Sequence, residues 1–97
     1  MSRWYTLDEN NIPIKTQSIQ EYIDWETDEK RIVKQDNIGK VIVSTVFLGL
    51  DHSYGRSIPI LWETMIFEGE HDGYQDRYSS YEDALKGHQK ALDLINK

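Results

Sequence analysis

The sequence predicts an α+β domain: an antiparallel sheet of four or five strands, a C-terminal helix packed on one face, and a short N-terminal helix. Two apolar runs rich in β-branched and aromatic residues, 40–50 and 58–68, flank a short polar segment and indicate a central β-hairpin. Apolar residues recur at helical spacing between residues 84 and 95. A chain of 97 residues is expected to form a single domain, residues 1–97, with one sheet and one or two helices.

The N-terminal elements are expected to be short. Segments 4–7 and 12–15 flank a turn-forming cluster and predict a weak hairpin. Pro13 makes its second arm either an edge strand or no strand at all. A helix is expected to begin at Ser18, with Glu21 at capping-box spacing, and to run to about residue 25. So short a helix is marginal alone and must dock on the sheet, through the face formed by Ile19, Tyr22 and Ile23.

The middle of the chain predicts the sheet itself. A polar connector at 27–30 precedes a strand at 31–35, and a turn at 36–39 leads into the central strand from Lys40. Alternate side chains of this strand point to opposite sides, and both sets are largely apolar. One helix covers only one face. We therefore expect a homo-oligomer, a dimer or tetramer, in which another subunit covers the second face.

The C-terminal part predicts the remaining sheet and the main helix. The return strand places Glu63 among apolar neighbours, residues 68–75 form a second hairpin loop, and residues 76–78 add a last strand. The final helix is expected to begin at Ser79, with Glu82 as its capping-box partner. Its buried stripe comprises Ala84, Leu85, His88, Ala91, Leu92 and Ile95, and Gly87 lies inside it, where glycine costs about 1 kcal/mol relative to alanine.

Composition excludes several classes of function. The chain has no cysteine, which excludes disulfides and thiolate metal sites and suits a reducing cytosol. No signal peptide or membrane-spanning run is present, so we expect a soluble cytoplasmic protein. The net charge of −6 disfavours DNA as a partner but allows a small anion held by a few basic side chains.

The loop of the central hairpin carries the first candidate site, Asp51, His52 and Arg56. A rigid sheet that raises a polar cluster of this kind is a common way to form a binding site. The alternative is an ordinary loop, in which Asp51 closes an Asx-turn and His52 is solvated.

Glu63 and His88 form the second candidate. A buried carboxylate needs a partner or a polar pocket, and Arg77, His88 and His52 are the candidate partners. The alternative for Glu63 is a purely structural ion pair, or a strand end that is simply exposed. His88 is either a core histidine held by one hydrogen bond or part of a His88–Glu63–His52 group. That group has the ligand types for zinc or manganese, but no motif supports it, so we predict no metal and no cofactor.

Arg77 and Tyr78, with Trp62, form the third candidate. Aromatic rings beside an arginine are a usual means of holding a nucleobase and its phosphate. The alternative is that Tyr78 packs under the final helix and Arg77 neutralises a carboxylate. The sequence has no Walker A motif, no GxGxxG and no recognisable nucleophile arrangement, and Thr45 is better suited to hydrogen-bonding a ligand.

Four stretches together resemble a widespread family of roughly hundred-residue phage and prophage proteins. They are the Trp4–Tyr5 start, VSTVFLGLDHSYG (43–55), PILWETMIF (59–67) and RYSSYEDALKGH (77–88). The resemblance implies a phage-encoded accessory protein in the host cytoplasm. Small phage proteins of this type include immune-evasion "sponges", such as anti-CBASS proteins that sequester cyclic dinucleotide defence signals.

The sponge analogy implies roles for individual residues. Tyr54, Trp62 and Tyr78 would stack bases, His52, Arg56 and Arg77 would neutralise phosphates, and Thr45, Asp51 and Glu63 would contact base or ribose edges. The expected function is therefore a non-enzymatic sponge for a cyclic dinucleotide such as cyclic GMP-AMP. The alternatives are an inhibitor that binds a host protein, and a small hydrolase built on His52, Glu63 and His88.

Overall fold

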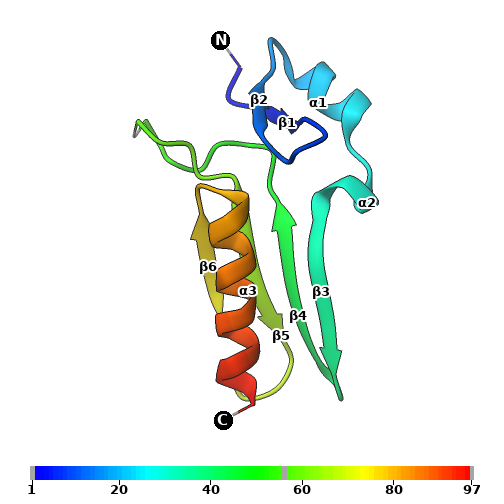
Figure 1. Ribbon diagram of the computed structural model, residues 1–97, viewed down its shortest axis with the longest axis vertical. Helices are drawn as coiled ribbons and strands as arrows, with labels where there is room; N and C mark the ends of the chain where they lie inside the picture. The colour runs from blue at the N-terminus through cyan, green and yellow to red at the C-terminus, as the bar shows by residue number, and fades with distance from the viewer. Residues whose placement is uncertain (1, 56, 97) are drawn as a thin grey trace.

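A computed structural model describes residues 2–55 and 57–96, which form a four-stranded antiparallel sheet with the C-terminal helix on one face (Figure 1). The sheet is a meander in which each strand pairs with the next along the chain, in the order β3-β4-β5-β6. Its strands are β3 (Ile32–Ile38), β4 (Val41–Phe47), β5 (Trp62–Phe67) and β6 (Gln75–Tyr78). The α+β prediction is confirmed.

The strand register puts every second residue on the same face of the sheet. Phe47 lies opposite Trp62, Thr45 opposite Thr64, and Val43 opposite Ile66, and these six side chains are almost completely buried. The predicted alternation of the two central strands is thus confirmed. Gly39 adopts a positive φ of 60° in the tight β3–β4 turn, a conformation that glycine adopts without strain.

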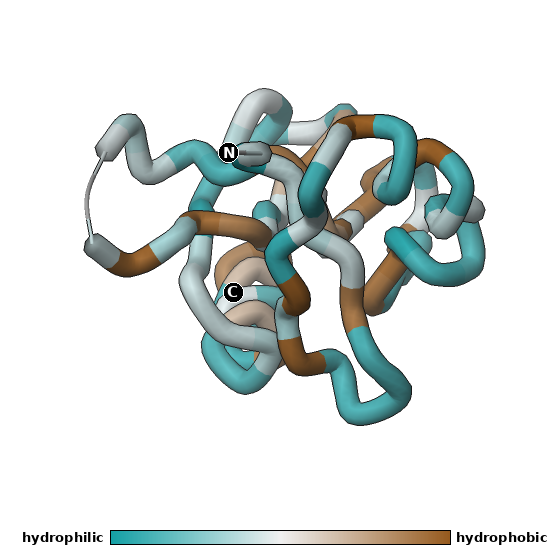
Figure 2. The backbone as a smooth tube through the Cα atoms, turned by 90° about the horizontal axis from the view of Figure 1, so that it is seen from above, coloured by the Kyte–Doolittle hydropathy of each residue, from teal (hydrophilic) through white to brown (hydrophobic). Residues whose placement is uncertain are grey.

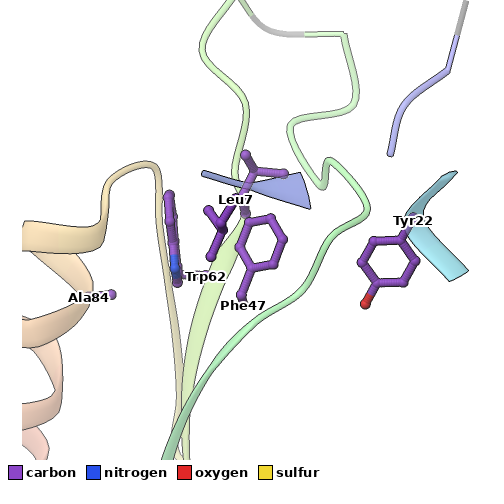
Figure 3. Close-up of a cluster of buried hydrophobic side chains, with 6 residues drawn as sticks. Leu7, Tyr22, Phe47, Trp62 and Ala84 are labelled. Atoms are coloured by element: carbon purple, nitrogen blue, oxygen red, sulfur yellow. The ribbon is translucent and has the colours of Figure 1, made fainter. Parts of the chain in front are cut away.

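The helix α3 (Tyr81–Ile95) packs along the face formed by these residues (Figure 1). Ala91 contacts the Val43–Ile66 end of the sheet, and Ala84 joins a larger cluster around Trp62. Figure 3 shows the Trp62 ring between Ala84 of α3 and Phe47 of β4. Small residues on the helix let it approach a strand surface that carries large aromatic side chains.

A small N-terminal unit covers one end of the same face. It consists of the hairpin β1 (Tyr5–Leu7) and β2 (Pro13–Lys15), followed by α1 (Ile19–Trp25) and α2 (Asp28–Arg31) (Figure 1). Its buried residues Leu7 and Tyr22 belong to the cluster that contains Phe47 and Trp62. The predicted first hairpin is present.

The connection between β4 and β5 is pinned by the N-terminal unit. Trp4 forms an isolated bridge with Leu50, and the Asp51 amide donates to the Arg3 carbonyl at 2.9 Å. Gly49 has a φ of 80°, and a Cβ there would collide with the Tyr22 ring. A glycine is therefore required where the connection passes under α1.

Several predicted boundaries are wrong. Residues 28–31 form α2 rather than a connector, because the Thr27 hydroxyl caps a turn by accepting from the Lys30 amide at 3.1 Å. Strand β3 continues to Ile38, and α3 is capped by Ser80, which accepts from the Asp83 amide at 3.1 Å, rather than by Ser79. Ser18 precedes α1 but makes no capping hydrogen bond with its side chain.

The predicted docking face of α1 is only partly correct. Tyr22 is buried, whereas Ile19 and Ile23 are about half exposed. Trp25 joins Tyr22 instead, with its ring 5.8 Å from that of Phe47 and nearly perpendicular to it. No helix in residues 2–55 and 57–96 is long and apolar enough to cross a membrane.

Candidate functional site

The predicted site residues lie in three separate places. Asp51, His52 and Tyr54 lie in the β4–β5 connection, Glu63 and Arg77 lie on the sheet face away from α3, and Thr45, Trp62 and Tyr78 lie between the sheet and α3. Arg56 lies outside the described residues. The nine residues therefore do not form one pocket within this chain, as far as it is described.

Asp51 organises its loop. Its Oδ1 accepts from the Ser53 amide at 2.7 Å and the Ile60 amide at 3.0 Å, and its Oδ2 accepts from the Ser53 hydroxyl at 2.9 Å. Partial burial opposes ionisation, but these hydrogen bonds and the nearby Arg3 guanidinium hold the pKa of Asp51 below its ordinary value. The structure supports the Asx-turn alternative for this residue.

His52 and Tyr54, the other described candidates in this loop, make fewer contacts than Asp51. His52 donates from Nδ1 to the Leu50 carbonyl at 2.7 Å, so this ring nitrogen is already used. Its ring meets the edge of Tyr54 at 6.5 Å. Tyr54 itself is 78% exposed, on a segment that extends away from the body of the molecule (Figure 2).

Glu63 and Arg77 form an ion pair across β5 and β6. Arg77 Nε donates to Glu63 Oε2 at 2.8 Å, and the side-chain amide of Gln75 donates to the same oxygen at 2.5 Å. Glu63 is only 8% exposed, so it is a buried carboxylate with two donors. Arg77 was one of its candidate partners.

Thr45 and Trp62 have no exposed surface. They cannot contact a ligand in this conformation, so the expectation that they belong to a binding site is wrong and both are core residues. Tyr78 lies under α3, as the alternative interpretation predicts. Its ring is so close to Gly87 that a Cβ at this position would collide with it. Burial raises the pKa of Tyr78, and the nearby Thr64 hydroxyl opposes the rise.

His88 links the helix to two strands. Its Nε2 donates to Asp36 Oδ2 at 2.7 Å, and its Nδ1 lies 2.6 Å from Thr45 Oγ1, which is 2.5 Å from Thr64 Oγ1. In a neutral imidazole, Nδ1 then accepts from the Thr45 hydroxyl, and Thr45 accepts from Thr64. Asp36 and Thr64 were not predicted, because only the strand register brings them here.

Asp36, His88 and Thr45 are hydrogen-bonded in the order of a catalytic triad, but the hydroxyl that would be the nucleophile is not accessible to solvent. Both threonines and His88 are completely buried, so a substrate cannot reach the Thr45 hydroxyl. The arrangement holds α3 to the sheet. His88 therefore cannot act with Glu63, which faces the opposite side of the sheet, or with His52 in the loop. The described residues contain no cluster of three potential metal ligands.

A groove between β6 and α3 collects basic side chains. Arg77, Lys86 and Lys90 line this cavity of about 440 Å³, together with Ile60, Asp76, Tyr78, Ser79, Asp83 and Gly87. They are all of the lysines and arginines between residues 57 and 96. Because Arg77 is paired with Glu63, Lys86 and Lys90 remain beside Asp76 and Asp83, so the described lining residues have no acidic excess although the net charge of the chain is −6.

No protein-family model, curated protein or solved structure matches this chain. The groove must therefore be interpreted from its own residues. Lys86 pairs with Glu82 at 3.2 Å, but both side chains are more than two-thirds exposed, so the pair holds the ammonium weakly. Glu63 engages the Nε of Arg77, so the Arg77 side chain is held toward the sheet face away from α3, although the residue also lines the groove.

Lys86 and Lys90 were missed by the sequence interpretation. Their spacing of four residues puts them on one side of a helix, and the apolar stripe puts the opposite side on the sheet. The position of the two lysines could therefore have been predicted from the sequence. The sequence could not show that Arg77 lines the same groove, because this depends on β6 being the edge strand nearest to α3.

A second cavity has the opposite character. It measures about 360 Å³ and lies between the β1–β2 turn, α2 and the start of α3. Asp8, Glu9 and Glu29 line it with Lys30 as their cationic counterpart, around the Trp25 ring. Its acidic walls would repel an anion.

Proposed function

We propose that this chain is a phage-encoded sponge, which binds an anionic nucleotide signal in the groove between β6 and α3 and does not cleave it. The proposed ligand class is a cyclic dinucleotide, such as cyclic GMP-AMP, in the cytoplasm of an infected host. The observation that supports it best is the gathering of Arg77, Lys86 and Lys90 around a cavity of about 440 Å³. Cavities of this size are typical for small-molecule ligands.

Charge and hydrogen bonding favour a phosphate at this position. The guanidinium of Arg77, turned from Glu63 toward the groove, would make bidentate contact with phosphate oxygens, and Lys86 and Lys90 would add the charge of two ammonium groups from α3. Ser79 brings a hydroxyl to the same groove. Asp76 and Asp83 also line it, and a carboxylate is the group expected to accept from a base or ribose donor.

The ligand assignment can be tested by incubation with a panel of cyclic dinucleotides, followed by heat release and analysis of the nucleotide. We expect the ligand to be recovered intact. Recovery of a linear product would mean that the chain is an enzyme. Failure of the whole panel to bind would reject the sponge proposal.

The groove can be tested in the same system by titration calorimetry. We expect Lys86→Ala and Lys90→Ala each to weaken binding about tenfold, which is the usual loss for a charge-assisted hydrogen bond. Arg77→Ala, made together with Glu63→Gln so that no carboxylate is left unpaired, should abolish binding and leave the domain folded. Lys40→Ala, an exposed lysine at the β3–β4 turn, is the matched control and should bind as the wild type does. Normal binding by the Arg77 variant would show that the site is elsewhere.

A second candidate function is inhibition of a host protein. It is favoured by the exposure of Tyr54 and Ile58, 78% and 64%, on a segment that projects from the molecule (Figure 2). Exposed aromatic and aliphatic side chains of this kind often anchor protein–protein contacts. The hydrolase alternative has no comparable support, because His52, Glu63 and His88 lie in three different places.

A further inference from the structure

The face of the sheet that points away from α3 is not covered by a helix in the described part of the chain. The register puts eleven side chains on this open face: Ile32, Gln35 and Asn37 from β3, Ile42, Ser44 and Val46 from β4, Glu63, Met65 and Phe67 from β5, and Gln75 and Arg77 from β6. Phe67 and Ile32 are 42% and 43% exposed, whereas the side chains facing α3 in β4 and β5 are nearly all completely buried.

The size of the open face is that of an interaction surface. Four strands about 4.8 Å apart, with about 3.3 Å per residue along each, give a footprint of about 400 Å². Two such footprints, one from each of two partners, total about 800 Å², which is in the range of weak, transient interfaces. The centre of the open face is Ser44, which lies beside Met65 and between Ile42 and Val46. A partner would therefore bury five apolar side chains, those of Ile32, Ile42, Val46, Met65 and Phe67, among six polar ones.

The charges on this face decide which partner fits it. Glu63 and Arg77 are its charged residues, and they neutralise each other. The chain as a whole carries a net charge of −6, so the acidic surplus lies on other surfaces. A partner selected by electrostatic attraction would be expected on those surfaces. A second copy carries the same net negative charge, so it is repelled least at a face whose own charges cancel.

We propose that the open face packs against the same face of a second copy, as an isologous sheet-on-sheet dimer. Two sheets would then stack about 10 Å apart, with each copy keeping α3 on the outside. The small footprint indicates a weak, reversible dimer. This inference does not depend on the ligand proposed for the groove.

The other exposed apolar side chains fit a second copy less well. Ile19 and Ile23 are about half exposed on α1, but Glu21, Asp24 and Glu26 lie beside them. Two such helices would repel each other. They provide a control site that has the same apolar exposure and a different charge.

The test is sedimentation equilibrium from micromolar to millimolar concentration. We expect the wild type to dimerise, and Met65→Lys and Phe67→Lys each to raise the dissociation constant about tenfold or more, because each places a lysine on the packed face. Ile23→Lys should dimerise as the wild type does. Circular dichroism should show all three variants folded, since the new side chains point to solvent in the monomer. A wild type that remains monomeric at millimolar concentration, or folded variants that dimerise normally, would overturn the proposal.

Discussion

Glu63 and His88 illustrate what can be predicted at the scale of a residue. Each stands among apolar neighbours in the sequence, so each was expected to have a polar partner. Arg77 was among the candidates for Glu63 and lies beside it. The partners of His88 could not be chosen in advance, because Thr45 and Asp36 are 43 and 52 residues away and only the strand register aligns them.

Asp51 allows a test by pH. Its pKa lies below the unfolded value of about 3.9, so the carboxylate contributes stability that is present above that pH and is lost as the pH falls through the lower folded pKa. We expect Asp51→Asn to cost about 1–2 kcal/mol at neutral pH and to flatten the loss of stability below pH of about 4. Urea unfolding at a series of pH values measures both effects. Glu70→Gln, at an exposed position, should keep the wild-type acid profile, and an unchanged profile in Asp51→Asn would contradict the role given to the carboxylate.

At the scale of the elements, the periodicity of apolar residues predicted which strand faces are buried, but it did not predict where the helices begin and end. The alternation in β4 and β5 follows from burial of one face, and the structure confirms it. The predicted stripe on α3 is only partly correct: Ala84, His88 and Ala91 are buried, whereas Leu85 is 39% exposed. The four-residue α2 carries no such pattern. Two adjacent serines could each have capped α3, and Ser80 does so one residue later than expected. The groove was not predicted, because Arg77 comes from β6 and Lys86 and Lys90 come from α3, and only the tertiary structure brings these two elements together.

Gly87 tests the contact between α3 and β6. Alanine there should gain about 1 kcal/mol of helix propensity, but its Cβ would collide with the hydroxyl and ring of Tyr78. We expect Gly87→Ala to be destabilising by about 1–3 kcal/mol in chemical unfolding, because a packed ring must move. In a Tyr78→Ala background the same change should be neutral or stabilising, since the obstacle is gone. A penalty that is equal in both backgrounds would show that the ring is not its cause.

At the scale of the whole molecule, α3 lies along one face of the sheet (Figure 1), and no helix in the described residues covers the other face. The sequence indicated that both faces of the central strand needed cover, and the described chain covers one of them. Composition could not show where the charge is placed. A net charge of −6 is compatible both with a neutral sheet face and with a groove in which lysines balance the aspartates.

Arg77 belongs to both of these surfaces, because it lies on the open face through its pairing with Glu63 and also lines the groove. Whatever draws its guanidinium toward one surface alters the other. If both proposals hold, occupancy of the groove and self-association would be thermodynamically coupled, and the coupling would be reciprocal. The factor by which a nucleotide changes the pairing of two copies would equal the factor by which pairing changes the affinity for the nucleotide. Sedimentation with and without saturating nucleotide measures that factor, and a value of one would show that Arg77 serves the two surfaces independently.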